Sequence, residues 1–173
     1  MERVIIVDEN DNFVRICERD QWNDGEIHQV SALWVSNSNG EILLAQRALA
    51  KKHAPGLWGP AAAGTVNEGE TYESNVIKEA EEEIGLQVKP EQLEVGHREL
   101  VGKPDNRRFR QWFMVKMDVP LESLKLQEEE VMSVKWMHFS HLELDLVENP
   151  ENYQGANQSS FPTLIEWTKN SLR

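Results

Sequence analysis

One stretch decides the fold: residues 64–86, which read GTVNEGETYESNVIKEAEEEIGL. Within it apolar residues recur at helical spacing, at Val76, Ile77, Ala80 and Ile84. Gly85 follows directly, and glycine is the usual residue where a chain leaves a helix. The sequence therefore predicts a helix from Thr71 to Ile84.

Three glutamates lie on one flank of this predicted helix. On a wheel of about 100° per residue, Glu79 and Glu83 fall directly beside the apolar stripe and Glu82 somewhat farther away. Like charges placed together in this way repel each other unless a cation joins them, and oxygen ligands suit Mg²⁺ or Mn²⁺. The alternative is an ordinary acidic face in solvent, which is the commoner meaning of such a run taken alone.

The remaining segments predict a mixed β-sheet flanked by helices, with an N-terminal β-hairpin. Extended runs occupy residues 3–7 and 13–17 (the hairpin), 30–35 and 41–47 (antiparallel neighbours across a Gly-terminated turn), 57–63, 95–101, 110–117 and 131–137. A C-terminal helix is expected over residues 161–172, with Ser160 as its N-cap. The polar residues 149–160 are expected to form a surface loop.

Bulk properties narrow the class of protein. A chain of 173 residues suits a single domain over residues 1–173. The formal net charge of -12 opposes binding of a nucleic-acid polymer. No leader peptide or membrane span is expected, and the lone Cys17 excludes an internal disulfide, so a cytoplasmic location is predicted.

The spacing inside residues 64–86 closely resembles the Nudix box. Gly64-x5-Glu70-x7-Lys78-Glu79-Ala80-x-Glu82-Glu83-x-Gly85-Leu86 follows the pattern G-x5-E-x7-R-E-U-x-E-E-x-G-U, where U is aliphatic. The resemblance implies the α+β Nudix fold, an α/β/α sandwich, and metal-dependent hydrolysis of a diphosphate linkage. It also implies that Gly64 lends a carbonyl to the metal site, that Glu79, Glu82 and Glu83 are ligands or the base, and that Glu70 supports the start of the helix.

One position departs from that pattern, and one ligand is expected outside it. Lys78 stands where the family usually has Arg, whose planar fork orients a carboxylate better than an ammonium group does. We therefore expect a working but slow site. Many Nudix enzymes add a carboxylate from beyond the box, and Glu130 in the run Glu128-Glu129-Glu130 is our choice, with a charged loop as the competing interpretation.

The segment upstream of the box, residues 47–58, resembles isopentenyl diphosphate isomerases, a branch of the same fold. By that resemblance Arg47 and Lys51 hold the substrate diphosphate. However, Ala63 occupies the position of the catalytic cysteine of the isomerases, and a methyl group cannot carry a thiolate. His28 aligns with a metal-binding His of that branch, but Gln21 replaces its partner, so a structural histidine is the favoured interpretation.

Hydrolysis of a nucleoside diphosphate linked to another moiety is therefore the expected function. An isomerase-like enzyme and a non-catalytic nucleotide-binding domain are the alternatives. The basic residues Arg107, Arg108 and Arg110 either meet a distal phosphate or offset acidic neighbours, and the second is slightly favoured. The hairpin and the C-terminal helix are both candidate surfaces for a homodimer.

Overall fold

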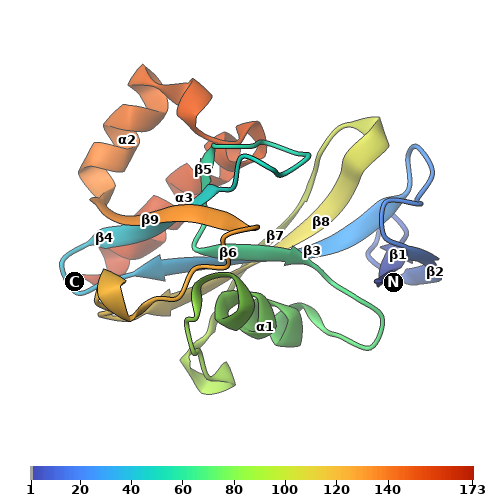
Figure 1. Ribbon diagram of the computed structural model, residues 1–173, viewed down its shortest axis with the longest axis horizontal. Coiled ribbons are helices and arrows are strands. Elements are labelled where there is room, and N and C mark those ends of the chain that lie inside the picture. Colours follow the sequence, from blue (N-terminus) through green and yellow to red (C-terminus); the bar gives the residue numbers. More distant parts are fainter. Residues whose placement is uncertain (1) are drawn as a thin grey trace.

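The computed structural model describes residues 2–173 as a mixed β-sheet with helices on both faces (Figure 1). The strands are β1 (Arg3–Val7), β2 (Phe13–Glu18), β3 (Ile27–Ser36), β4 (Glu41–Arg47), β5 (Trp58–Gly59), β6 (Ala62–Thr65), β7 (Glu94–Val101), β8 (Arg107–Lys116) and β9 (Val131–His138). The α-helices are α1 (Tyr72–Ile84), α2 (Phe139–Glu148) and α3 (Gly155–Ser171).

Strand β3 is the centre of the sheet. Along one side it pairs in parallel with β8, from Ile27 opposite Arg107 to Ser36 opposite Lys116. Along the other side it pairs antiparallel with three strands in turn, first β1, then β6 and finally β4. The expected antiparallel pairing of residues 30–35 with 41–47 is thus limited to the turn end, because β4 diverges to pair with β9. This divergence leaves room for β6, the strand that leads into α1.

Alternation of side chains along the central strands builds two hydrophobic layers. On β3, Leu33 and Val35 face one cluster, which includes Val76, Ala80 and Ile84 of α1. Ala32 and Trp34 face the opposite cluster, which includes residues of α2 and α3. Figure 1 shows α1 on one face of the sheet and α2 and α3 on the other. The α/β/α arrangement expected from the sequence is therefore confirmed.

Helix α1 ends where the sequence predicts. The side chain of Thr71 accepts a hydrogen bond from the Ser74 backbone N–H, and a reciprocal bond completes a capping box. At the other end Gly85 adopts the left-handed conformation, with φ of 68°, and its N–H donates to the carbonyls of Ala80 and Glu81. The carboxylate-bearing helix therefore has a defined start and end.

Three expectations about other elements were wrong. The strand expected over 57–63 is broken into β5 and β6, with Pro60 between them, since proline cannot donate to a sheet ladder. Helix α2 was not expected at all. Helix α3 begins at Gly155 and contains Pro162, so Ser160 lies inside the helix instead of capping it. Its hydroxyl lies in the buried network of Arg110 and Glu99.

Helix α3 has 17 residues, yet neither it nor any other helix within residues 2–173 combines the length and apolar character needed to cross a membrane.

Candidate active site

Strand β6 and helix α1 meet at Gly64. This residue pairs with Ser31 of β3, and the side chain of Glu79 lies directly above it. A Cβ atom added at Gly64 would stand 2.2 Å from Cδ of Glu79. Because no side chain fits there, the glycine lets the first carboxylate of the box lie against the backbone of β6.

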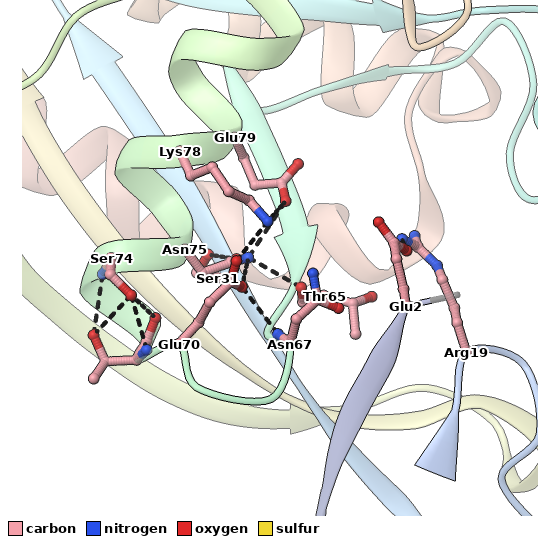
Figure 2. A network of polar contacts seen from close by, with 11 residues as sticks. Glu2, Arg19, Ser31, Thr65, Asn67, Glu70, Ser74, Asn75, Lys78 and Glu79 are labelled. Atoms are coloured by element: carbon pink, nitrogen blue, oxygen red, sulfur yellow. Dashed lines mark hydrogen bonds and ion pairs between the residues drawn. The ribbon is translucent and has the colours of Figure 1, made fainter. Parts of the chain in front are cut away.

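Asn75 fixes the helix to the sheet beside this contact (Figure 2). Its Nδ2 donates to the Thr65 carbonyl at 3.0 Å and to Oε1 of Glu79 at 3.3 Å, and its Oδ1 accepts from the Ser31 hydroxyl. The side chain is fully buried. Asn75 was not among the residues expected at the site, although it lies four positions before Glu79 and therefore on the same flank of the helix.

Glu70 and Lys78 form a second contact beside Asn75. The Lys78 Nζ lies 2.6 Å from Oε1 of Glu70 and 3.6 Å from Oε1 of Glu79. Oε2 of Glu70 accepts from the Asn67 backbone N–H at 3.0 Å and from Asn75 at 2.9 Å. Glu70 thus ties the loop before α1 to its first turns, and Lys78 links Glu70 to Glu79 (Figure 2).

Glu83 is the most buried of the three box glutamates, with 9% of its surface exposed. The Ala63 backbone N–H donates to its Oε2 at 3.2 Å. Burial, reinforced by the charges of Glu79 and Glu130, raises the pKa of Glu83 to about 8. Burial also raises the pKa of Glu79, and Glu82 adds to that rise. Glu82 itself is exposed. Exposure therefore increases from Glu83 to Glu79 to Glu82, which is the order of their distance from the apolar stripe on the helical wheel.

Three residues expected at the site from outside the box, Arg47, Lys51 and Glu130, lie near Glu83. Glu130 lies just before β9, and its carboxylate accepts from Nζ of Lys51 at 2.5 Å. Its charge acts on both Glu83 and Arg47. Arg47 ends β4, and its Nε donates to the His53 carbonyl at 2.9 Å. Burial lowers the pKa of Arg47, whereas Glu83 and Glu130 raise it.

The donor set suits a hard divalent cation. Within residues 2–173 no three His, Cys, Asp or Glu side chains already converge as a set of metal ligands. Glu79 instead contacts Asn75 and Lys78, while Glu83 contacts the Ala63 backbone. Nevertheless, half-buried Glu79 and buried Glu83 act on each other's charge, and both have raised pKa values, which a bound cation would lower. All the donors are oxygens, as Mg²⁺ and Mn²⁺ prefer.

A cavity of about 180 Å³ opens beside Ala63 and Gly64. Its lining combines four arginines from separate segments, Arg19, Arg47, Arg108 and Arg110. Of the basic run on β8, Arg107 pairs with Glu9 at the surface and Arg110 pairs with Glu99 in the interior, so these two do offset acidic neighbours. Sequence analysis did not identify Arg19, because the hairpin that carries it lies far from the box in the chain.

His28 also lines this cavity. Its ring stacks on Trp22, with the ring centroids 4.4 Å apart and the planes at 20°. Burial, together with the charges of Arg108 and Arg19, lowers its pKa to about 3. The histidine is therefore neutral near pH 7, and it packs against Trp22, in the segment that follows the hairpin.

The chain is similar in sequence to a known protein family and to several of its members. The NUDIX domain family matches residues 27–156. An uncharacterized Nudix hydrolase of Pseudomonas aeruginosa is 31% identical over 137 residues, which are 79% of this chain and 78% of that protein. An isopentenyl-diphosphate Delta-isomerase of Klebsiella pneumoniae is 32% identical over 89 residues, which are 50% of this chain and 48% of that enzyme. The chain thus matches about half of the isomerase.

A solved structure agrees with the fold. The crystal structure of a Deinococcus radiodurans protein superposes with a TM-score of 0.72 at 21% identity, covering 99% of this chain and 100% of that one. The family match extends over well more than half of the residues and contains the whole box with its four glutamates. The chain therefore belongs to the NUDIX domain family and is a Nudix-type hydrolase of phosphorus-containing anhydrides.

Proposed function

We propose that this protein hydrolyses the diphosphate linkage of a nucleoside diphosphate joined to another moiety, with Mg²⁺ or Mn²⁺ as its cofactor. Glu79, Glu82 and Glu83 would hold the metal together with Glu130 and the Gly64 carbonyl. The observation that carries the proposal is the pair of half-buried Glu79 and buried Glu83 beside Gly64, with Arg47 near enough for the charge of Glu83 to act on it.

Each residue around this pair has a distinct task. A divalent metal ion, when bound, neutralises charge on the phosphoryl oxygens and makes water more acidic. Arg47 and Lys51, which lie beside these carboxylates, would bind and orient the diphosphate. One of the box glutamates accepts a proton from the attacking water. Lys78 positions Glu79, because it bridges Glu79 and Glu70.

Isomerase-like chemistry is the alternative that the relatives raise, since some of them are named isopentenyl-diphosphate isomerases. Protonation of a carbon by a thiol would need a cysteine near the site. Ala63 of β6 lines the cavity, and Cys17 is buried on β2, where it packs with Val4 and Ile6. The residues at the site therefore favour hydrolysis.

A non-catalytic nucleotide-binding domain is the second alternative. Such a role needs the cavity but not a full set of carboxylates. The intact glutamates of the box favour catalysis.

We further propose a single domain over residues 1–173 and a cytoplasmic location, both predicted from the sequence.

The test is product analysis with a panel of anhydrides. The purified protein is incubated with Mg²⁺ or Mn²⁺ and with nucleoside triphosphates, dinucleoside polyphosphates, nucleotide sugars and isopentenyl diphosphate. Glu82→Gln and Glu79→Gln are compared with Glu81→Gln, a matched control because Glu81 is an exposed glutamate of the same helix.

Metal-dependent cleavage that is lost in Glu79→Gln and Glu82→Gln, and kept in Glu81→Gln, is the expected result. An isomerised prenyl product would establish the isomerase instead. Binding of a nucleotide with no turnover in any metal would establish the binding domain. Equal activity in all three variants would remove the glutamates from the proposed mechanism.

A further inference from the structure

The basic cavity has an internal order. Arg47 lies next to the carboxylates, since Glu83 and Glu130 act on its charge. Arg108 lies beyond it, where its charged neighbours are Arg110, Arg47 and Glu99. The cavity therefore begins at the proposed diphosphate site and extends away from it, toward β8 and the hairpin. A protein with a net charge of -12 does not gather arginines here by composition alone.

Arg108 lacks the partner that its neighbours have. Arg107 and Arg110 each pair with a glutamate, but in residues 2–173 no carboxylate lies within ion-pair distance of Arg108. Its Nη1 donates to the Asn106 carbonyl at 3.1 Å. Burial, together with Arg110 and Arg47, lowers its pKa to about 10. A partly buried guanidinium with two cationic neighbours and no carboxylate at ion-pair distance is costly, and an anion bound in the cavity lowers that cost.

Two further polar atoms in the cavity wall lack partners. His28 and Asn157 are 3% and 1% exposed, and within the described residues neither Nδ1 of His28 nor Nδ2 of Asn157 has a hydrogen-bond partner. Oδ1 of Asn157 accepts from Arg110 at 2.6 Å, so its amide group is a free donor. The His28 ring bonds to the Arg107 backbone, which leaves Nδ1 as a free acceptor. Native proteins leave few such groups without a hydrogen bond, so these two groups are candidates for hydrogen bonds to a bound ligand.

A cation, a donor and an acceptor in one cavity define the chemistry that fits it. We infer that this cavity is the subsite for the part of the substrate beyond the scissile diphosphate, and that it takes a phosphorylated sugar. The additional phosphate pairs with Arg108, and sugar hydroxyls bond to His28 and Asn157. An unphosphorylated sugar would leave Arg108 uncompensated, and an apolar chain would leave all three groups unsatisfied. The inference rests on the proposed function, because it names the substrate class of that site.

Matched substrate pairs that differ by one phosphate test this subsite. Coenzyme A is compared with dephospho-coenzyme A, and NADPH with NADH, and kcat/KM is measured for the wild type, Arg108→Gln and Arg107→Gln. Arg107 is the matched control, since it is the adjacent residue and pairs with Glu9 at the surface. Circular dichroism and thermal melting establish that each variant is folded.

We expect the wild type to prefer the phosphorylated member of at least one pair by about tenfold or more, as a charge-assisted hydrogen bond predicts. Arg108→Gln removes the preference by lowering kcat/KM for that member alone, and Arg107→Gln keeps it. An equal loss for both members would assign Arg108 to the scissile diphosphate and overturn the inference. His28→Phe keeps the ring stack on Trp22 but loses the acceptor, so it raises KM for the preferred substrate with little change in kcat.

Binding without turnover separates this inference from the proposed function. Ribose 5-phosphate and ribose, which contain no anhydride, are titrated by calorimetry into the wild type and both arginine variants. We expect the phosphate ester to bind to the wild type and Arg107→Gln and at least tenfold more weakly to Arg108→Gln. If this holds but nothing in either panel is cleaved, the proposed function fails and the subsite stands. If anhydrides are cleaved with no phosphate preference, or ribose 5-phosphate binds no better than ribose, the subsite fails.

Discussion

Glu83 shows how far a single residue of the site departs from what stability alone would favour. Its carboxyl is buried against Ala63 and lies near two other acidic groups. The pKa of about 8 lies well above the ordinary 4.5. Burial of a charge is tolerated in this position because the site needs an oxygen ligand, which is the usual conflict between activity and stability.

The sign of the pH effect follows from that shift. Below pH 4.5 Glu83 is neutral in both the folded and the unfolded chain, so its contribution to stability is highest there. Between pH 4.5 and 8 the folded protein holds a proton that the unfolded chain releases, and stability falls as pH rises. Glu83→Gln removes the charge and should raise the free energy of unfolding of the metal-free protein at pH 9 by about 2 kcal/mol.

Urea unfolding at pH 4 and pH 9, in EDTA, measures this difference. The two proteins should have nearly the same stability at pH 4, and Mg²⁺ should stabilise the wild type more than the variant at pH 9. Glu81→Gln is the control, since that side chain is exposed on the same helix. A variant that is less stable than the wild type at pH 9 would contradict the assignment of a buried, repelled carboxylate.

Lys78 poses a question of orientation. It contacts both Glu70 and Glu79, and the family pattern usually has Arg at this position. Lys78→Arg should keep kcat or raise it severalfold, because a planar fork can hold the two carboxylates more firmly. Lys78→Met should lower kcat by about tenfold, as expected for loss of a positioning contact. Steady-state kinetics at saturating Mg²⁺ test both, and a smaller kcat for the Arg variant than for the Met variant would refute a positioning role.

At the scale of elements, α1 could be predicted and the surroundings of its carboxylates only in part. The helix had a regular apolar stripe, a capping threonine and a terminal glycine, all local signals that the structure retains. Helix α2 was not predicted because its apolar residues do not mark one buried face. Leu142 is buried, whereas Leu144 and Val147 are exposed. Asn157 and Ser160 lay in a stretch that reads as loop, yet α3 carries both into the interior beside Arg110.

The contact between β6 and α1 gives a prediction at this scale. Gly64→Ala places a methyl group where Glu79 now lies, and the obstacle is a flexible side chain. The fold should therefore persist, while Glu79 swings away from the backbone of β6. We expect about a tenfold loss of Mn²⁺ affinity and a matching loss of turnover, with little change in melting temperature.

Calorimetric titration with Mn²⁺ and a thermal melt of the same sample test this expectation. Gly155→Ala is the matched control, because a Cβ atom there meets nothing within 4 Å. Unchanged metal affinity in Gly64→Ala would show that the close approach of Glu79 to β6 has no part in the metal site.

For the whole molecule, the question is what holds the N-terminal hairpin against the sheet. Within residues 2–173, strand β1 pairs with β3 at two positions, Ile6 opposite His28 and Val7 opposite Ile27. The hairpin nevertheless carries Arg19 and the segment after it carries Trp22, and both line the cavity. Its position therefore matters to the substrate site, and periodicity in the sequence contains no information about it.

Asp11, in the turn of that hairpin, joins it to the rest of the fold. Its carboxylate accepts from the Tyr72 hydroxyl at 3.0 Å, from Nη1 of Arg98 at 2.5 Å and from Nε2 of Gln29 at 2.8 Å. These partners belong to α1, β7 and β3. With φ of 63°, Asp11 is also in the left-handed region, which Asp and Asn tolerate better than most residues. One side chain therefore links the hairpin to the helix and to the sheet.

Asp11→Asn tests this link without disturbing the turn, because it keeps the shape and the tolerance for positive φ. Loss of the charge should lower the free energy of unfolding by about 2 kcal/mol and speed amide exchange in β1 and β2 before that in β3. Asp20→Asn is the control, since Asp20 also has φ of 63° but lies exposed. Tyr72→Phe combined with Asp11→Asn should cost less than the sum of the two, because Asp11→Asn already weakens the hydrogen bond that Tyr72→Phe removes. Strict additivity, or hairpin exchange as slow as in the wild type, would mean that contacts other than those of Asp11, such as β1 pairing and the Glu9–Arg107 ion pair, hold the hairpin, and the cavity wall would then be insensitive to Asp11.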